Sequence, residues 1–167
     1  AQAIPRAAAM IETFRAIGYT LETAVADIVD NSISAYAKNI WINRIWKGGN
    51  STITFIDDGH GMTGDEIIQA MRPGAQNPLE KRKETDLGRF GLGLKTASFS
   101  QCRTLTVMSK IKGKRPEFWT WSLDHVARSD RWELIHWLPK GFEHELDDLI
   151  SGTIVIWTDP DRIIPAT

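Results

Sequence analysis

A chain of 167 residues with 42% apolar and 25% charged residues can bury one substantial core, so we expect one domain over residues 1–167. A net charge of −1 excludes a general attraction to nucleic acid, and no apolar run is long enough to cross a bilayer. The lone Cys102 excludes an intrachain disulfide, and no export signal is visible, which favours a cytoplasmic protein. Because the chain starts at Ala1 and stops soon after a strand-like segment, we expect an N-terminal fragment of a longer protein.

The beginning of the chain has the spacing of two helices. Apolar residues recur at helical intervals over residues 7–17, and Gly18 ends that segment. Thr20 is a candidate N-cap for a second helix. The apolar stripe of that helix comprises Leu21, Ala24, Val25, Ile28 and Val29.

Two strands are predicted next, at residues 39–46 and 51–57, joined by KGGN as a β-hairpin. Thr63 and Glu66 then form a capping box, which predicts a helix that continues to about Met71. The rest of the pattern predicts a long polar loop at 72–86, helices at 93–100 and 143–150, and strands at 103–110, 117–123, 131–138 and 152–159. Helices followed by antiparallel strands predict an α+β fold.

The predicted second helix carries polar residues among its apolar ones. Asp27 and Asn31 are four residues apart and therefore share a helical face, with Asp30 and Ser34 beside them. An asparagine next to a carboxylate can give a neutral oxygen to Mg²⁺ while the acid orients a water. The alternative is an ordinary solvated helix face.

The sequence IDDGHGM at 56–62 ends a strand with two acids and then two glycines. An aspartate at a strand end, here Asp57, can accept a hydrogen bond from an exocyclic amine such as that of adenine. Gly59 and Gly61 let the backbone bend under a flat ring, and His60 is interpreted as structural. The alternative is a strand-to-helix turn in which these residue types serve the backbone alone.

Two further segments, at 88–93 and 151–157, are candidates for ligand binding. Glycines over residues 88–93 lead into a predicted helix, an arrangement whose backbone N–H groups and helix dipole can hold an anion. The pattern is neither a P-loop nor a convincing dinucleotide fingerprint. The sequence SGTIVIW at 151–157 is a strand start with a small polar pair.

In chain order, the four segments resemble the four motifs of the GHKL ATPases, which include gyrase, heat-shock-ninety chaperones, histidine kinases, MutL and MORC proteins. The matching stretches are DIVDNSISA (27–35), DDGHGM (57–62), GRFGLGLK (88–95) and GTIVIW (152–157). The resemblance implies the Bergerat fold, a two-layer α/β sandwich with helices on one face of a mixed, mostly antiparallel sheet. The lid motif looks most like the MORC, MutL and chaperone branch.

The resemblance also implies roles at the matching positions. Asn31 would ligate Mg²⁺, and Asp27 would stand where many members have a glutamate that activates the attacking water. Ala35 and Lys38 would face the nucleotide. Because aspartate is one methylene shorter than glutamate, turnover would be slow or would use a second water.

For the base, the resemblance implies that Asp57 binds the adenine amino group, that Gly61 and Met62 line the ring, and that Thr153 supports it through water. The lid motif would wrap the phosphates, with a lysine near the γ-phosphate. Its residues are Gly88, Arg89, Phe90, Gly91, Leu92, Gly93 and Lys95.

The function so predicted is Mg²⁺-dependent ATP binding with slow hydrolysis. ATP would close a lid formed by about residues 72–93, and the closed lid would gate homodimerisation or contact with a downstream domain or client protein. One alternative is a nucleotide-sensing module without significant hydrolysis. Another is a DNA-associated module of MutL or MORC type.

A histidine kinase is excluded, because none of the four histidines lies on a helical hairpin of the kind that is phosphorylated. Five tryptophans in the predicted strands after residue 100 are better explained by sheet packing than by a partner surface; they are Trp119, Trp121, Trp132, Trp137 and Trp157. A basic hairpin around Gly113 is either a solvated turn or a DNA-phosphate contact; its cations are Lys110, Lys112, Lys114 and Arg115.

Overall fold

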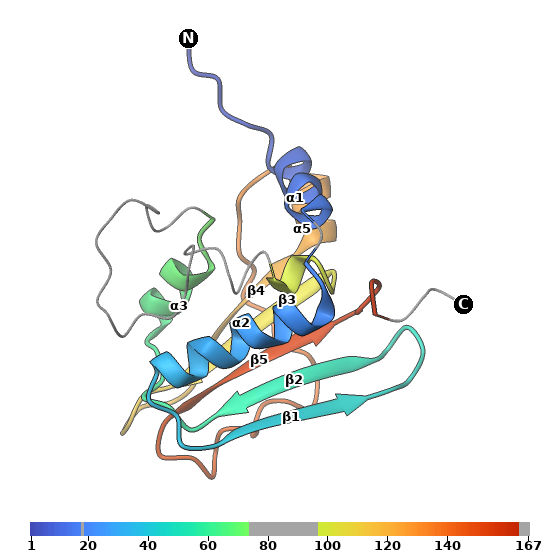
Figure 1. The fold of residues 1–167 in the computed structure, drawn as a ribbon. Helices are drawn as coiled ribbons and strands as arrows, with labels where there is room; N and C mark the ends of the chain where they lie inside the picture. Colours follow the sequence, from blue (N-terminus) through green and yellow to red (C-terminus); the bar gives the residue numbers. More distant parts are fainter. Residues whose placement is uncertain (18, 74–96, 164–167) are drawn as a thin grey trace.

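The computed structural model describes residues 1–17, 19–73 and 97–163. Its elements alternate between helices and antiparallel strands along the chain (Figure 1). In order they are α1 (Ala7–Ala16), α2 (Leu21–Ser34), β1 (Ile40–Ile45), β2 (Thr52–Asp57), α3 (Gly64–Met71), β3 (Thr104–Lys110), β4 (Glu117–Ser122), α5 (Leu123–Ser129) and β5 (Gly152–Thr158).

The strands form one sheet in the order β1-β2-β5-β3-β4, and every neighbouring pair is antiparallel. Helix α2 lies across one face of this sheet (Figure 1). On the same side α3 packs against β3 and β4, and α1 packs against α5. The predicted α+β class, with helices on one sheet, is confirmed.

The local signals explain why the helices begin where they do. The Thr20 side chain accepts a hydrogen bond from the Thr23 N–H at 3.2 Å and starts α2. Thr63 and Glu66 form the predicted reciprocal capping box of α3. Ser122 caps α5 by accepting from the His125 N–H.

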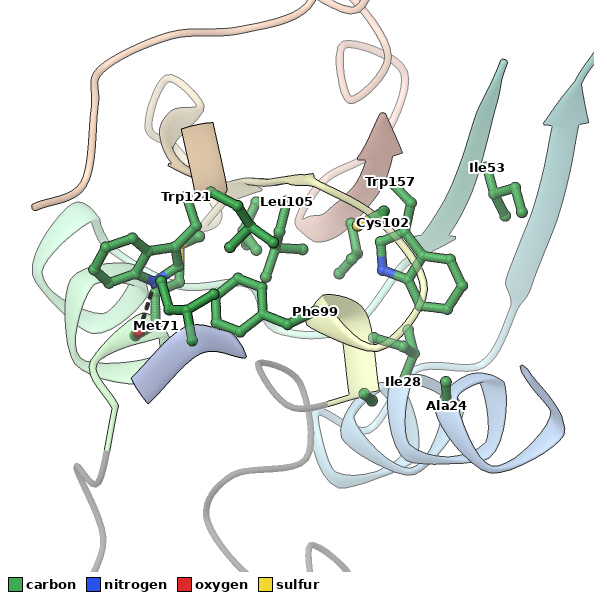
Figure 2. Packing of buried hydrophobic residues seen from close by; sticks show 14 of the residues in the cluster. Ala24, Ile28, Ile53, Met71, Phe99, Cys102, Leu105, Trp121 and Trp157 are labelled. Carbon is green, nitrogen blue, oxygen red and sulfur yellow. Dashed lines mark hydrogen bonds between the residues drawn. The ribbon is translucent and has the colours of Figure 1, made fainter. Parts of the chain in front are cut away.

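The larger core lies between the helices and the sheet. Alternate residues of the strands, such as Ile53 and Leu105, point into it from the sheet, and Ile28 points into it from α2 (Figure 2). Two tryptophans are fully buried there with their N–H groups satisfied: Trp121 donates to the Met71 carbonyl and Trp157 to the Ser98 hydroxyl, both at 2.8 Å. Sheet packing, predicted for five tryptophans, is confirmed for these two, but it is wrong for Trp132 and Trp137, which lie outside the strands and are exposed.

The opposite face of the sheet is covered by an irregular segment around residues 138–149. Leu146 is fully buried there against apolar residues of β3 and β5, such as Met108 and Ile154. The Lys110 ammonium donates to three backbone carbonyls of this segment, at 3.1, 3.3 and 2.7 Å; they belong to Leu146, Asp147 and Leu149. Lys110 therefore supplies hydrogen bonds to backbone carbonyls that, in a helix or strand, would be paired with backbone N–H groups.

Several sequence-based boundaries are wrong. Residues 131–138 are not a strand, because only Ile135 pairs with the sheet, opposite Thr120. Leu123 begins α5, which was not predicted, and residues 143–148 form turns in place of a helix. Leu21 is exposed, so the stripe of α2 is narrower than predicted. Of the predicted helix at 93–100, residues 97–99 are helical and 93–96 lie outside the described residues.

Candidate functional site

The C-terminal end of β2 places a buried carboxylate under α2. Asp57 is only 6% exposed, and its side chain points to the helical face of the sheet with Phe55 and Ile53. The Ser32 hydroxyl donates to Oδ2 at 2.8 Å and the Gly59 N–H donates to Oδ1 at 2.9 Å. Burial raises the pKa of Asp57, while these two hydrogen bonds act in the opposite direction.

Two hydroxyl groups lie beside Asp57 on the next two strands of the sheet. Thr153 lies opposite Asp57 in the β2–β5 pairing and opposite Ser109 in the β3–β5 pairing. The hydroxyls of Ser109 and Thr153 are 2.7 Å apart. Ser109 Oγ also accepts from the Met62 N–H at 2.8 Å and donates to the Gly152 carbonyl at 3.0 Å. The site thus has a polar floor built from three neighbouring strands.

The glycine turn after β2 fits tightly against its surroundings. Gly59 packs on Ala35, where an added Cβ would lie 2.8 Å from the Ala35 Cβ, and the His60 N–H donates to the Ala35 carbonyl at 3.0 Å. His60 Nδ1 lies 2.7 Å from the Gly61 carbonyl oxygen, a local contact consistent with a structural role. Ala35 is therefore a support of this turn.

The second acid of the turn has a different environment. Asp58 accepts from the Lys38 N–H and the Asn39 N–H, and from the Asn39 side chain, at 2.7–2.8 Å. These hydrogen bonds lower the pKa of Asp58, the Asn39 side chain having the largest effect. Asp58 therefore fixes the start of β1, and the Lys38 side chain is exposed beside it.

Gly61 has a positive φ of 73° and lies against the backbone of Lys110, whose carbonyl carbon would be 2.7 Å from an added Cβ. We expect Gly61→Ala to destabilise the fold by about 2–5 kcal/mol, since a left-handed alanine and a backbone overlap both cost energy. Gly113 is the matched control, because it has a φ of 78° and no atom near an added Cβ.

Urea unfolding of the two variants measures this difference. Gly113→Ala should lose only about 1–2 kcal/mol, the cost of the backbone conformation alone. Equal losses in the two variants would contradict the close approach of Gly61 to Lys110.

The polar residues of α2 occupy one flank of the helix. Asp27 is partly buried and Asn31 is exposed one turn further on, as the spacing predicts. Burial raises the pKa of Asp27, and the negative charge of Asp30 adds to the effect. Burial also raises the pKa of Tyr19, and the negative charge of Asp27 adds to that effect.

These groups differ in what they can bind. Asp27 and Asn31 present oxygen ligands on a flank of α2, whereas Asp57 and Thr153 lie on the sheet floor. Among the described residues, no three or more His, Cys, Asp or Glu side chains gather as a metal cluster. A Mg²⁺ ion fits this chemistry because it keeps several waters and takes few protein ligands when phosphates supply the others.

The predicted phosphate-wrapping residues are Gly88, Arg89, Phe90, Gly91, Leu92, Gly93 and Lys95, and all of them lie outside the described residues. Their role stays a prediction, as do the roles of Gly61, Met62 and Thr153 toward a base. Ser32 and Ser109 were missed. A signal existed for each: Ser32 follows Ile28 by four residues on the buried stripe, and Ser109 follows Val107 by two on the inward side of β3.

The family model described as "Histidine kinase-, DNA gyrase B-, and HSP90-like ATPase" matches residues 19–153. The chain belongs to this family. The match includes α2, the glycine turn and the start of β5, and the family is one of ATP-binding domains. Within the described residues, no helix combines the length and apolarity needed to traverse a membrane.

Curated relatives belong to the branch predicted from the lid motif. MutL, a DNA mismatch repair protein, is 30% identical over 135 residues in Paramagnetospirillum magneticum, covering 78% of this chain and 21% of that protein. MORC family CW-type zinc finger protein 3 of Mus musculus is 29% identical over 90 residues, covering 53% and 10%. ATPase morc-1 of Caenorhabditis elegans is 30% identical over 91 residues, covering 54% and 10%. The chain thus spans 10% to 21% of these relatives.

Proposed function

We propose that the chain binds Mg²⁺–ATP between α2 and the sheet, with adenine at Asp57, and hydrolyses it slowly. The observation that carries this proposal is the Asp57 carboxylate, which is buried at a strand end although no cation pairs with it in the described part of the chain. Burying an ionised carboxylate is costly unless donors reach it. An exocyclic amine would supply one more donor.

The proposed division of labour follows from where the side chains lie. Asp57 would accept from the adenine amino group, and Thr153 would support the base through a water. Asn31 would contribute its amide oxygen to Mg²⁺, which when bound neutralises phosphate charge. Asp27 would accept a proton from the attacking water, because burial brings its pKa closer to neutral pH.

The proposal includes a switch. ATP would close the lid segment of about residues 72–93, and this change would gate homodimerisation or contact with a downstream domain or client protein. Membership of an ATPase family and the relatives MutL and morc-1 support it. Equal protease sensitivity of this segment with and without a non-hydrolysable ATP analogue would count against the switch.

The magnesium assignment has a direct test. Asn31→Ala should abolish Mg²⁺-dependent binding of ATP in calorimetry, while Asn50→Ala, the same change at an exposed residue of the β1–β2 hairpin, should bind as the wild type does. Titrations with ATP, ADP and a non-hydrolysable ATP analogue, each with and without Mg²⁺, separate phosphate from base recognition. Equal magnesium dependence in the two variants would remove Asn31 from the metal site.

Two alternatives differ from this proposal in what they require. A nucleotide sensor would bind ATP in the same site without turnover, and the shorter Asp27 motivates it. A DNA-associated role would rely on the basic hairpin, where Lys112, Lys114 and Arg115 are exposed. Lys110 is not part of such a surface, because its ammonium is held by three backbone carbonyls.

A further inference from the structure

Strand β1 forms one edge of the sheet and is exposed along nearly its whole length (Figure 1). Four large apolar side chains on the strand and directly after it, Trp41, Ile42, Ile45 and Trp46, are 43% to 51% exposed. Ile42 lies on the helical face of the sheet, opposite Phe55, whereas Trp41 lies on the other face, opposite Ile56. The edge is therefore apolar on both faces.

Edge strands of natural sheets usually carry features that prevent pairing with another chain, such as lysine, proline or a bulge. In β1 the pairing with β2 runs without interruption, and the strand contains neither lysine nor proline. Its one charged residue, Arg44, lies over the Trp46 ring at 5.9 Å. The outer N–H and C=O groups of β1 thus remain suited to a further strand.

The sequence of β1 is complementary to itself. A two-fold axis perpendicular to the sheet through Asn43 would place Arg44 opposite Ile42 of a second copy, since opposed residues must share a face. Ile45 would then lie opposite Trp41, and Trp46 opposite Ile40. An axis through Arg44 would oppose two guanidinium groups, and one through Ile42 would oppose Asn43 to Trp41. The axis through Asn43 is therefore the one that best separates the charges and pairs the apolar side chains.

We propose that two copies of the chain associate through antiparallel pairing of β1 with β1, centred on Asn43, to form one continuous sheet. This interface needs no nucleotide and goes beyond the proposed ATP-binding function.

Two charge variants on neighbouring exposed residues test both the interface and its register. Asn43→Glu would set two carboxylates directly opposite each other and should raise the dimer dissociation constant roughly tenfold or more. Ile42→Glu introduces the same charge one residue away, but opposite Arg44 of the second copy, and should keep the dimer. Sedimentation velocity over a concentration series, without nucleotide and with ATP, measures both.

The expected result is a nucleotide-independent wild-type dimer, lost in Asn43→Glu and kept in Ile42→Glu, with all three chains giving the same circular dichroism spectrum. A wild-type protein that stays monomeric would overturn the proposal, and the free edge of β1 would then be available only to a strand of another polypeptide. A dimer that both variants keep, or that both lose equally, would overturn it as well, since neither result is compatible with a two-fold axis at Asn43.

Discussion

Replacing Asp57 by asparagine should weaken ATP binding roughly 10- to 100-fold, the loss expected for one hydrogen bond to a charged group. The same change should stabilise the empty protein near neutral pH. Asp57 is buried and has a raised pKa, so ionising it costs the folded state more than the unfolded state. The stability that the protonated Asp57 contributes is fully present below its unfolded pKa and is lost as pH rises through the folded pKa.

Asp58 is the matched control, because the adjacent carboxylate has a pKa shifted in the opposite direction. A lowered folded pKa contributes stability above the unfolded pKa, which is lost as pH falls through the folded value. Asp58→Asn should therefore keep most of the ATP binding and lower the melting temperature at neutral pH. Calorimetric titration and thermal melts from pH 3 to pH 8 would separate the two residues. Unchanged ATP binding in Asp57→Asn would remove Asp57 from the base site.

Replacing Asp27 by asparagine should reduce ATP turnover by about 10²- to 10⁴-fold, the usual contribution of a general base, and leave ATP binding nearly intact. Asparagine keeps the shape of the side chain and one acceptor oxygen but takes up no proton from water. Burial is the main reason that the pKa of Asp27 is raised, and Asp30 adds to it. Both effects bring the carboxylate closer to the basicity that proton transfer at neutral pH needs.

Asp30→Asn serves as the control and adds a second readout. Removing its negative charge should lower the pKa of Asp27 and move the acidic limb of the kcat–pH profile to lower pH, with turnover at neutral pH largely kept. Single-turnover phosphate release from pH 5 to pH 9 measures both variants. Full turnover in Asp27→Asn would assign the base elsewhere, and a wild type without turnover would favour the nucleotide sensor.

The sequence predicted the elements whose signals are local. Capping residues such as Thr20 and Thr63 marked helix starts, and alternation marked β2, β3 and β5. Residues 131–138 show the limit of that reasoning, because alternation reports a half-buried extended segment but not whether a sheet edge is available to pair with it. The hydrogen bonds from the Lys110 ammonium to the backbone carbonyls around residues 146–149 likewise join segments that are far apart in sequence. No local sequence pattern could have predicted them.

In the candidate site, too, local signals could be predicted from the sequence and contacts between distant segments could not. Asp57 could be predicted because an acid and two glycines follow a strand, and the structure indeed buries it. Ser32 and Ser109 became recognisable only once α2 and β3 were placed over and beside Asp57, because a serine on a buried stripe is also compatible with plain packing. The distinction between Asp57 and Asp58 likewise depends on Asn39, which is 19 residues from Asp58 in the chain.

The pair of hydroxyl groups on the sheet floor has a fixed polarity. Ser109 accepts from the Met62 N–H and donates its only proton to the Gly152 carbonyl, so in the contact between the two hydroxyls the proton must come from Thr153. Thr153 is then left with lone pairs only, like Asp57 beside it. A purine with an amino group at this edge meets oxygens that can accept from it, directly or through water. A purine with a carbonyl there would meet lone pairs alone, so in the proposed ATP site the hydrogen bonds of Ser109 to two backbone groups would favour adenine over guanine.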